Sequence, residues 1–113
     1  MTQRQLSEFL EDILDAITEI EGFIANVRFE AFIENREKVL AVVKLLEIIG
    51  EATKKIPDEL RRQYPDIPWK AVTGMRDVLV HEYWQVDEAV VWGTVTEALP
   101  VLKAAIVQMI EWD

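Results

Sequence analysis

The sequence contains no cysteine, and this absence excludes several kinds of protein. Without thiols there is no disulfide framework, no thiolate zinc site and no cysteine nucleophile. Long apolar runs are also missing: the longest, Val39 to Gly50, is interrupted by Lys44 and Glu47 and falls short of the roughly 20 residues that a membrane helix needs. Acidic residues recur within positions 8–15, which is not the pattern of a signal peptide. We therefore expect a soluble, cytoplasmic protein with no membrane partner.

Motifs for nucleotides and metals are missing as well. There is no glycine-rich phosphate loop, so any nucleotidyl transfer must come from a partner. Glu47 and Glu51 lie one helical turn apart and could form half of a carboxylate metal site, but the Glu-x-x-His pairs of di-iron bundles do not accompany them. A solvated face, with Glu51 paired to Lys55, is the favoured interpretation. We expect no metal and no cofactor.

Positive charge is scarce: 12 basic against 21 acidic residues give a net charge of −9. This balance argues against a general nucleic-acid coat. The charge is uneven, however, because residues 36–83 are near neutral while the remainder is strongly acidic. If an anion binds anywhere, this middle segment offers the least repulsion. Four of its cations could hold RNA phosphates or form an ordinary solvated surface: Lys54, Lys55, Arg61 and Arg62.

The apolar half of the chain is spaced like the buried faces of helices. Steps of three and four residues predict four main amphipathic helices, at about residues 6–20, 36–56, 67–83 and 88–112. The length of 113 residues suits one domain spanning 1–113. Short corners between these helices predict an all-α fold, an antiparallel bundle of four to five helices. A domain this small buries only roughly 60–70% of its unfolded surface, so pairing with a second copy is a plausible source of stability.

Glycine and proline mark the interruptions. Gly50 lies mid-helix, where it costs about 1 kcal/mol relative to alanine, and a common reason to keep it is the close approach of another backbone. Pro57 ends that helix, and Pro65 and Pro68 make a rigid corner. Pro100 lies inside the last helix and is expected to kink it.

Three local patterns add detail. Asp87 is suited to be the N-cap of the last helix. A short helical turn is expected at Arg28–Glu34, with three side chains pointing inward: Phe29, Phe32 and Ile33. A second apolar face on the 36–56 helix predicts contacts on two sides, through Leu45, Ile48 and Ala52.

Most reactive side chains are scattered, but the segment Gly74–Trp84 gathers several, including the only histidine, His81. On a continuous helix Asp77 lies one turn before His81, so its carboxylate can orient the imidazole. Arg76 and Tyr83 return to nearly the same face. Arg76 and His81 are about 140° apart on an ideal helix, so they converge only if the guanidinium sweeps round or the helix end distorts near His81.

These groups suit metal-free cleavage of an RNA backbone. A neutral imidazole can take the proton from a ribose 2′-hydroxyl, which then attacks the adjacent phosphorus. A guanidinium stabilises the charge that builds on the phosphate oxygens, and Tyr83 could donate to a phosphate or orient the leaving group. The residues alone favour a structural or capping role for a lone histidine, so both interpretations stay open at this point.

Several motifs follow one another along the chain: Leu46–Ala52, Lys54–Pro57, Ile67–Trp69, Gly74–Tyr83, Val86–Asp87 and Val91–Trp92. In this order they resemble the HepT-like branch of the HEPN superfamily. The resemblance implies a helical-bundle homodimer that acts as a metal-independent endoribonuclease. It further implies the toxin of a type II/VII-like toxin–antitoxin pair, whose partner is MntA, a minimal nucleotidyltransferase.

The signature of that family is an arginine followed by a polar residue, a histidine separated from the arginine by four to six residues, and a tyrosine two residues after the histidine. Arg76, Asp77, His81 and Tyr83 match it. The resemblance implies that Arg76 and His81 are catalytic, that Asp77 supports them, and that the antitoxin attaches AMP to Tyr83. It also implies that the sites of two subunits face one cleft, which these residues could line: Glu47, Gly50, Glu51, Lys54 and Trp84.

Two other classes of function remain open. The same cleft could belong to a non-catalytic helical module that binds a nucleotide or the nucleotidyltransferase, and the blandest alternative is a helical adaptor. The intact set of Arg76, His81 and Tyr83 favours the enzyme. The tryptophans could stack bases, although their helical spacing favours core or interface positions: Trp69, Trp84, Trp92 and Trp112.

Overall fold

The computed structural model describes residues 5–82 and 85–112, apart from the side chains of residues 78, 81, 82 and 112. Most of this part of the chain is helical and very little of it is strand, which confirms the predicted all-α fold. The elements, in chain order, are α1 (Leu6–Ile24), α2 (Phe29–Glu34), α3 (Arg36–Thr53), α4 (Asp58–Arg61), α5 (Trp69–Thr73), α6 (Met75–Leu79), β1 (Val80–Glu82), β2 (Gln85–Val86), α7 (Glu88–Gly93), the π-helical turn η1 (Thr94–Ala98) and α8 (Leu99–Trp112).

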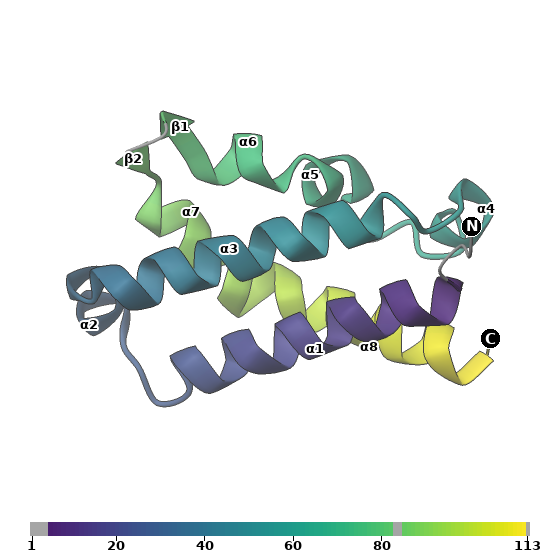
Figure 1. Ribbon diagram of the computed structural model, residues 1–113, viewed down its shortest axis with the longest axis horizontal. Coiled ribbons are helices and arrows are strands. Elements are labelled where there is room, and N and C mark those ends of the chain that lie inside the picture. Colours follow the sequence, from purple (N-terminus) through teal and green to yellow (C-terminus); the bar gives the residue numbers. More distant parts are fainter. Residues whose placement is uncertain (1–4, 83–84, 113) are drawn as a thin grey trace.

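The long helices pack side by side with alternating directions (Figure 1). α1 and α3 are antiparallel neighbours, α8 packs against α1, and α5 and α6 lie along α3. The core forms where their apolar faces meet, and its largest fully buried side chains include Leu10, Ile17, Leu46, Ile49 and Ile106. Burial of these faces, at about 25 cal/mol per Å² of apolar surface, is the main force that assembles the bundle.

Side-chain caps fix where two helices begin. Asp87 accepts a hydrogen bond from the backbone N–H of Val90 at 3.2 Å, so its predicted role as the N-cap of α7 is confirmed. Asn35 does the same for α3, accepting from the N–H of Lys38 at 3.1 Å. Such caps satisfy backbone donors that have no partner inside the helix.

The expected helix from residue 67 to Tyr83 is wrong in this form. The chain makes two short helices instead, α5 and α6, with Gly74 between them. α6 ends at Leu79, where Val80 turns to an extended backbone (φ −124°, ψ 117°) and β1 pairs with β2 in an antiparallel hairpin. β-branched valine favours that extended conformation, and the Leu79 carbonyl accepts a hydrogen bond from the Asp87 N–H at 2.8 Å, which holds the hairpin closed.

Pro100 distorts the last helix through a change of helix type. Proline has no N–H, and its ring clashes with the carbonyl one turn earlier in an α-helix. The preceding turn, η1, is a π-helix, and such wider turns occur as single insertions in α-helices. The threonine hydroxyls around it bond back to the helix, Thr94 to the Val90 carbonyl at 2.7 Å and Thr96 to the Trp92 carbonyl at 2.8 Å.

The helical stretch Glu88–Glu111 is long and apolar enough, by length and composition, to cross a membrane, a test that core helices also pass. Here its side chains supply one wall of the core, including Val91, Leu99 and Ile106. About a third of the apolar window is buried in this way, 33%.

One of the expectations about apolar faces needs correction. Phe32 is fully buried and stacks at 5.1 Å from the ring of Trp92, but Ile33 is 37% exposed. One residue along a helix turns the side chain by about 100°, and in α2 this turn points Phe32 into the core and leaves Ile33 at the surface. The expectation that the 36–56 helix makes contacts on two sides is confirmed, because α3 packs against α1 on one side and against α5 and α6 on the other (Figure 1). Parts of α3 stay uncovered: Ile48 is 38% exposed and Leu40 is 45% exposed.

Candidate active site

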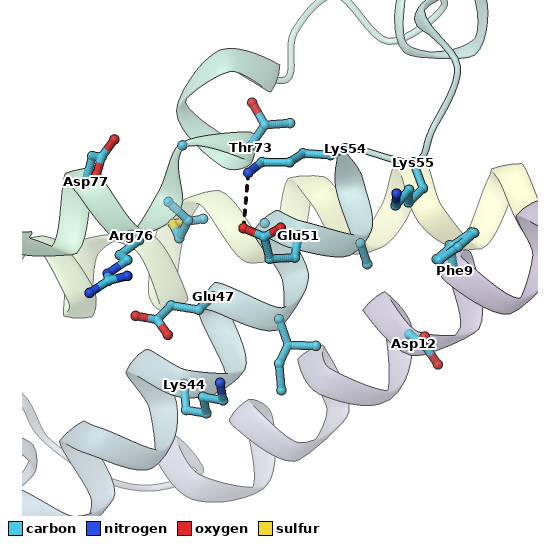
Figure 2. Close-up of a pocket in the computed structure, with 15 residues that line it drawn as sticks. Phe9, Asp12, Lys44, Glu47, Glu51, Lys54, Lys55, Thr73, Arg76 and Asp77 are labelled. Atoms are coloured by element: carbon cyan, nitrogen blue, oxygen red, sulfur yellow. Dashed lines mark hydrogen bonds and ion pairs between the residues drawn. The ribbon is translucent and has the colours of Figure 1, made fainter. Parts of the chain in front are cut away.

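A cavity of about 550 Å³ lies between α1, α3 and the α5–α6 segment (Figure 2). Phe9 and Asp12 come from α1, and Thr73 to Asp77 come from the α5–α6 segment. α3 and the residues that follow it supply the remainder: Lys44, Glu47, Ile48, Gly50, Glu51, Ala52, Lys54 and Lys55. The cavity therefore brings together segments far apart in the sequence.

Gly50 allows the α5–α6 segment to lie directly on α3. A Cβ atom at this position would come within 2.8 Å of the Val72 carbonyl oxygen and 3.1 Å of the Met75 Cβ. Separations this short cannot be accommodated without a shift of the backbone. The expectation that Gly50 permits a close backbone approach is confirmed, and the contact fixes the start of α6 at the edge of the cavity.

Arg76 and Asp77 stand in the first turn of α6, and both are exposed and line the cavity. Figure 2 shows the Arg76 side chain on the same side of the cavity as Glu47 of α3. Within the described part of the chain, neither a hydrogen bond nor an ion pair holds the Arg76 guanidinium. A guanidinium carries N–H donors in a planar fork that matches the oxygens of a phosphate.

The cavity wall carries four cations and four carboxylates, a balance that matches the near-neutral middle of the chain. One pair is joined: Lys54 donates to Glu51 at 3.0 Å. The expected pairing of Glu51 with Lys55 is therefore wrong. Lys54 and Lys55 both lie within one helical turn of Glu51, and Lys54, the i,i+3 neighbour, makes the contact. Residues 5–82 and 85–112 contain no group of three or more histidine, aspartate or glutamate side chains that could hold a metal ion.

His81 lies beyond the end of α6, and its backbone belongs to β1. Three expected relations assumed a continuous helix through His81, and they do not apply because that helix ends at Leu79. They are the one-turn spacing of Asp77 and His81, the shared face of Arg76 and Tyr83, and the 140° separation of Arg76 and His81. The distortion near His81 that the sequence required for convergence is present in the backbone. Tyr83 and Trp84 lie outside the described residues.

Other candidates have structural roles. The indole N–H of Trp69 donates to the carbonyls of Arg61 at 2.9 Å and Tyr64 at 3.1 Å, so Trp69 ties α5 to α4. Trp92 packs on the rings of Phe29 and Phe32. Arg61 pairs with Asp58 at 2.5 Å. None of these three side chains lines the cavity around Arg76.

The sequence analysis missed several residues on the cavity wall. Phe9 is half-buried and lines the cavity. Lys44 and Asp12 were assigned to no site. No local pattern marks these residues, because their place depends on how α1 lies across α3.

Comparison with known proteins gives a consistent result. Residues 13–109 match the family model described as "Ribonuclease HepT-like". The chain is 46% identical over 103 residues to "Putative RNase MJ1216" of Methanocaldococcus jannaschii, covering 91% of this chain and 85% of that protein. It is also 46% identical over 101 residues to "Probable ribonuclease HepT" of Thermococcus cleftensis, covering 89% of this chain and 92% of that protein. No solved structure matches.

The family match covers residues 13–109, which include Arg76, the cavity wall formed by α3 and the α5–α6 segment, and the hairpin that carries His81. This chain belongs to the ribonuclease HepT-like family.

Proposed function

We propose that the protein is a metal-independent endoribonuclease that uses Arg76 and His81. The observation that carries the proposal is the exposed guanidinium of Arg76 at the edge of the cavity, without a partner in the described part of the chain. His81 follows five residues later, where the chain has left the helix. Membership of the ribonuclease HepT-like family supports the same reaction class.

The reaction needs a base and a group that stabilises charge. In the proposed mechanism, the neutral imidazole of His81 removes the proton from a ribose 2′-hydroxyl. The 2′-oxygen attacks the adjacent phosphorus, the bond to the 5′-oxygen breaks, and that oxygen takes up a proton. The products are a 2′,3′-cyclic phosphate and a 5′-hydroxyl. Arg76 donates to the phosphate oxygens as their charge increases, and Asp77 has a supporting role.

We further propose that two copies pair, with their cavities facing one cleft. The exposed apolar side chains of α3 support this, because Leu40 and Ile48 leave an uncovered surface on the helix that forms the cavity wall. Exposed apolar patches of this kind are typical of interaction sites.

In this proposal the protein is the toxin of a pair, and a minimal nucleotidyltransferase of the MntA type silences it by attaching AMP to Tyr83. The AMP group would add bulk and a negative charge to the proposed RNA-binding cleft, so RNA would be both blocked and repelled. In co-expression with such a partner, the intact mass should rise by whole AMP units. Tyr83→Phe should abolish the rise, and a mass that increases equally in this variant would exclude Tyr83 as the acceptor.

The nuclease is tested with end-labelled single-stranded RNA in the presence of EDTA. We expect the wild-type protein to produce fragments ending in a cyclic phosphate, His81→Ala to be inactive, and Arg76→Ala to cleave about 10²–10³-fold more slowly. Arg62→Ala is a matched control, since Arg62 is exposed and lies outside the cavity. Equal activity of His81→Ala and wild type would overturn the proposal. RNA binding without cleavage by the wild type would identify a non-catalytic binding module instead.

A further inference from the structure

A second cavity, of about 250 Å³, lies between the Asp66–Pro68 corner, the α5–α6 segment and the η1–α8 helix. Its walls are mostly apolar and include Ile67, Met75 and Leu102. Met75 also lines the cavity around Arg76, so the two cavities share part of a wall. The volume lies below the range of roughly 300–1,000 Å³ of pockets that take small ligands. The space therefore suits a single apolar side chain better than a cofactor.

The apolar surface continues from this cavity along α8. Val101 lines the cavity and is 50% exposed, and Pro100 and Ala104 beside it on α8 are exposed as well. The most apolar window of the helical stretch Glu88–Glu111 has a mean hydropathy of 1.5, yet only 33% of it is buried. An apolar helix surface that stays uncovered next to a hollow is typical of an interaction site.

The π-helical turn η1 forms one side of the cavity. Thr94, Glu97 and Ala98 of this turn line it. Such turns are rare, and they occur frequently at functional sites. The place of η1 is a reason to regard the cavity as a binding site that is independent of the apolar surface.

The charges at the cavity have one sign. Among the described residues that line it, Asp66 and Glu97 are exposed carboxylates and none is a lysine or an arginine. The one basic residue of α8, Lys103, is joined to Glu21 of α1 at 2.9 Å. A second copy of the chain brings a net charge of −9, and it is repelled here, as is an anionic lipid surface. The rim is instead complementary to a basic partner.

We propose that this surface docks an amphipathic, basic helix of another protein. An aliphatic side chain of that helix enters the cavity, and its arginines or lysines lie beside Asp66 and Glu97. A helix that lays its apolar face into a groove is a recurrent mode of recognition. The side chain in the pocket supplies most of the affinity, and the rim charges select the partner. The inference does not depend on the proposed nuclease, because it concerns a cavity other than the one that holds Arg76.

The docking is tested with a designed helical peptide of about 15 residues, with leucines at positions i, i+4 and i+7 and arginines on both sides of them. The protein is labelled at its methionine methyl groups and titrated in an NMR experiment. The Met75 signal should shift, whereas the signal of Met109, which is buried outside the cavity, should not. An unchanged Met75 signal would overturn the proposal. An equal shift with serines in place of the leucines would also overturn it, because charge alone would then explain the binding.

The apolar contact has its own variant. Val101→Ser should weaken binding of the leucine peptide about 5-fold, as expected for a side chain at the centre of an interface. Ile33→Ser is the matched control, since Ile33 is 37% exposed on α2 and lies outside the cavity. Equal affinities of the two variants would contradict the proposed contact. If Val101→Ser changes the molar mass measured by light scattering, a second copy covers this surface and the proposal is wrong.

The rim charges are tested by a pair of double variants that change the net charge equally. Asp66→Asn with Glu97→Gln should weaken binding of the arginine-bearing peptide about 2- to 30-fold at low salt, and the difference should disappear at high salt. Glu30→Gln with Glu34→Gln should have little effect, because both of these exposed residues belong to α2 and lie outside the cavity. Equal weakening by both pairs would show that the net charge, and not the rim, attracts the peptide.

Discussion

The guanidinium of Arg76 is the side chain on which the proposed chemistry most directly depends. Its planar fork can contact two phosphate oxygens at once, and lysine cannot reproduce this geometry. We expect Arg76→Ala to lower kcat by about 10²–10³-fold, as for the loss of one preorganised donor to a transition state, and Arg76→Lys to recover only part of that loss. Single-turnover cleavage of labelled RNA measures both. Full activity of the lysine variant would show that only the charge matters.

Gly50 gives a prediction about stability. Gly50→Ala introduces a Cβ at 2.8 Å from a backbone oxygen, and overpacking of this kind costs about 1–3 kcal/mol, which exceeds the gain of about 1 kcal/mol in helix propensity. We expect a net loss of free energy of unfolding, measured by urea denaturation. Gly22→Ala is the control: it lies within α1 with nothing within 4 Å of the new methyl, and it should be stabilising. A stabilised Gly50→Ala protein would contradict the observed contact.

At the scale of elements, the sequence predicted the parts of the fold that depend on local pattern. The apolar spacing located α1 and α3, and Asp87 located the start of α7. The end of α6 could not be predicted, because Val80 suits either helix or strand. The hydrogen bond from the Asp87 N–H to the Leu79 carbonyl decides between the two. The same holds for the cavity: Glu47, Gly50, Glu51 and Lys54 share a helix with readable spacing, whereas Phe9 and Lys44 join them only through tertiary packing.

Asp87 joins two of these elements and so allows a test of the hairpin. Its side chain caps α7, and its backbone N–H donates a hydrogen bond to the carbonyl of Leu79, the last residue of α6. Asp87→Ala should reduce the free energy of unfolding by about 1 kcal/mol, the typical value of an N-cap, while Asp87→Asn, which keeps the acceptor, should reduce it much less. Urea denaturation compares the two. Equal losses in both variants would show that the carboxylate charge, and not the cap, is responsible.

At the scale of the whole molecule, part of α3 leaves apolar side chains exposed that a stable monomer would be expected to bury. Leu40 is 45% exposed there, and Val101 on α8 is 50% exposed on a different helix. If α3 forms the proposed dimer, Leu40→Asp should convert it to a monomer that keeps its helical circular dichroism, because a buried unpaired charge is costly. Val101→Asp should remain a dimer. Light scattering after size exclusion measures both, and the reverse result would place the interface on α8.

The contact between Gly50 and Val72 has a mechanical consequence. At Gly50 no flexible side chain separates α3 from the segment that carries Arg76, so we expect the two to move as one rigid body. A push on the outer side of α3, such as a docking neighbour would exert, would be transmitted to the arginine without being absorbed on the way. Dimer assembly would then be coupled to the position of Arg76, and dissociation of the dimer would also displace Arg76 from its catalytic position.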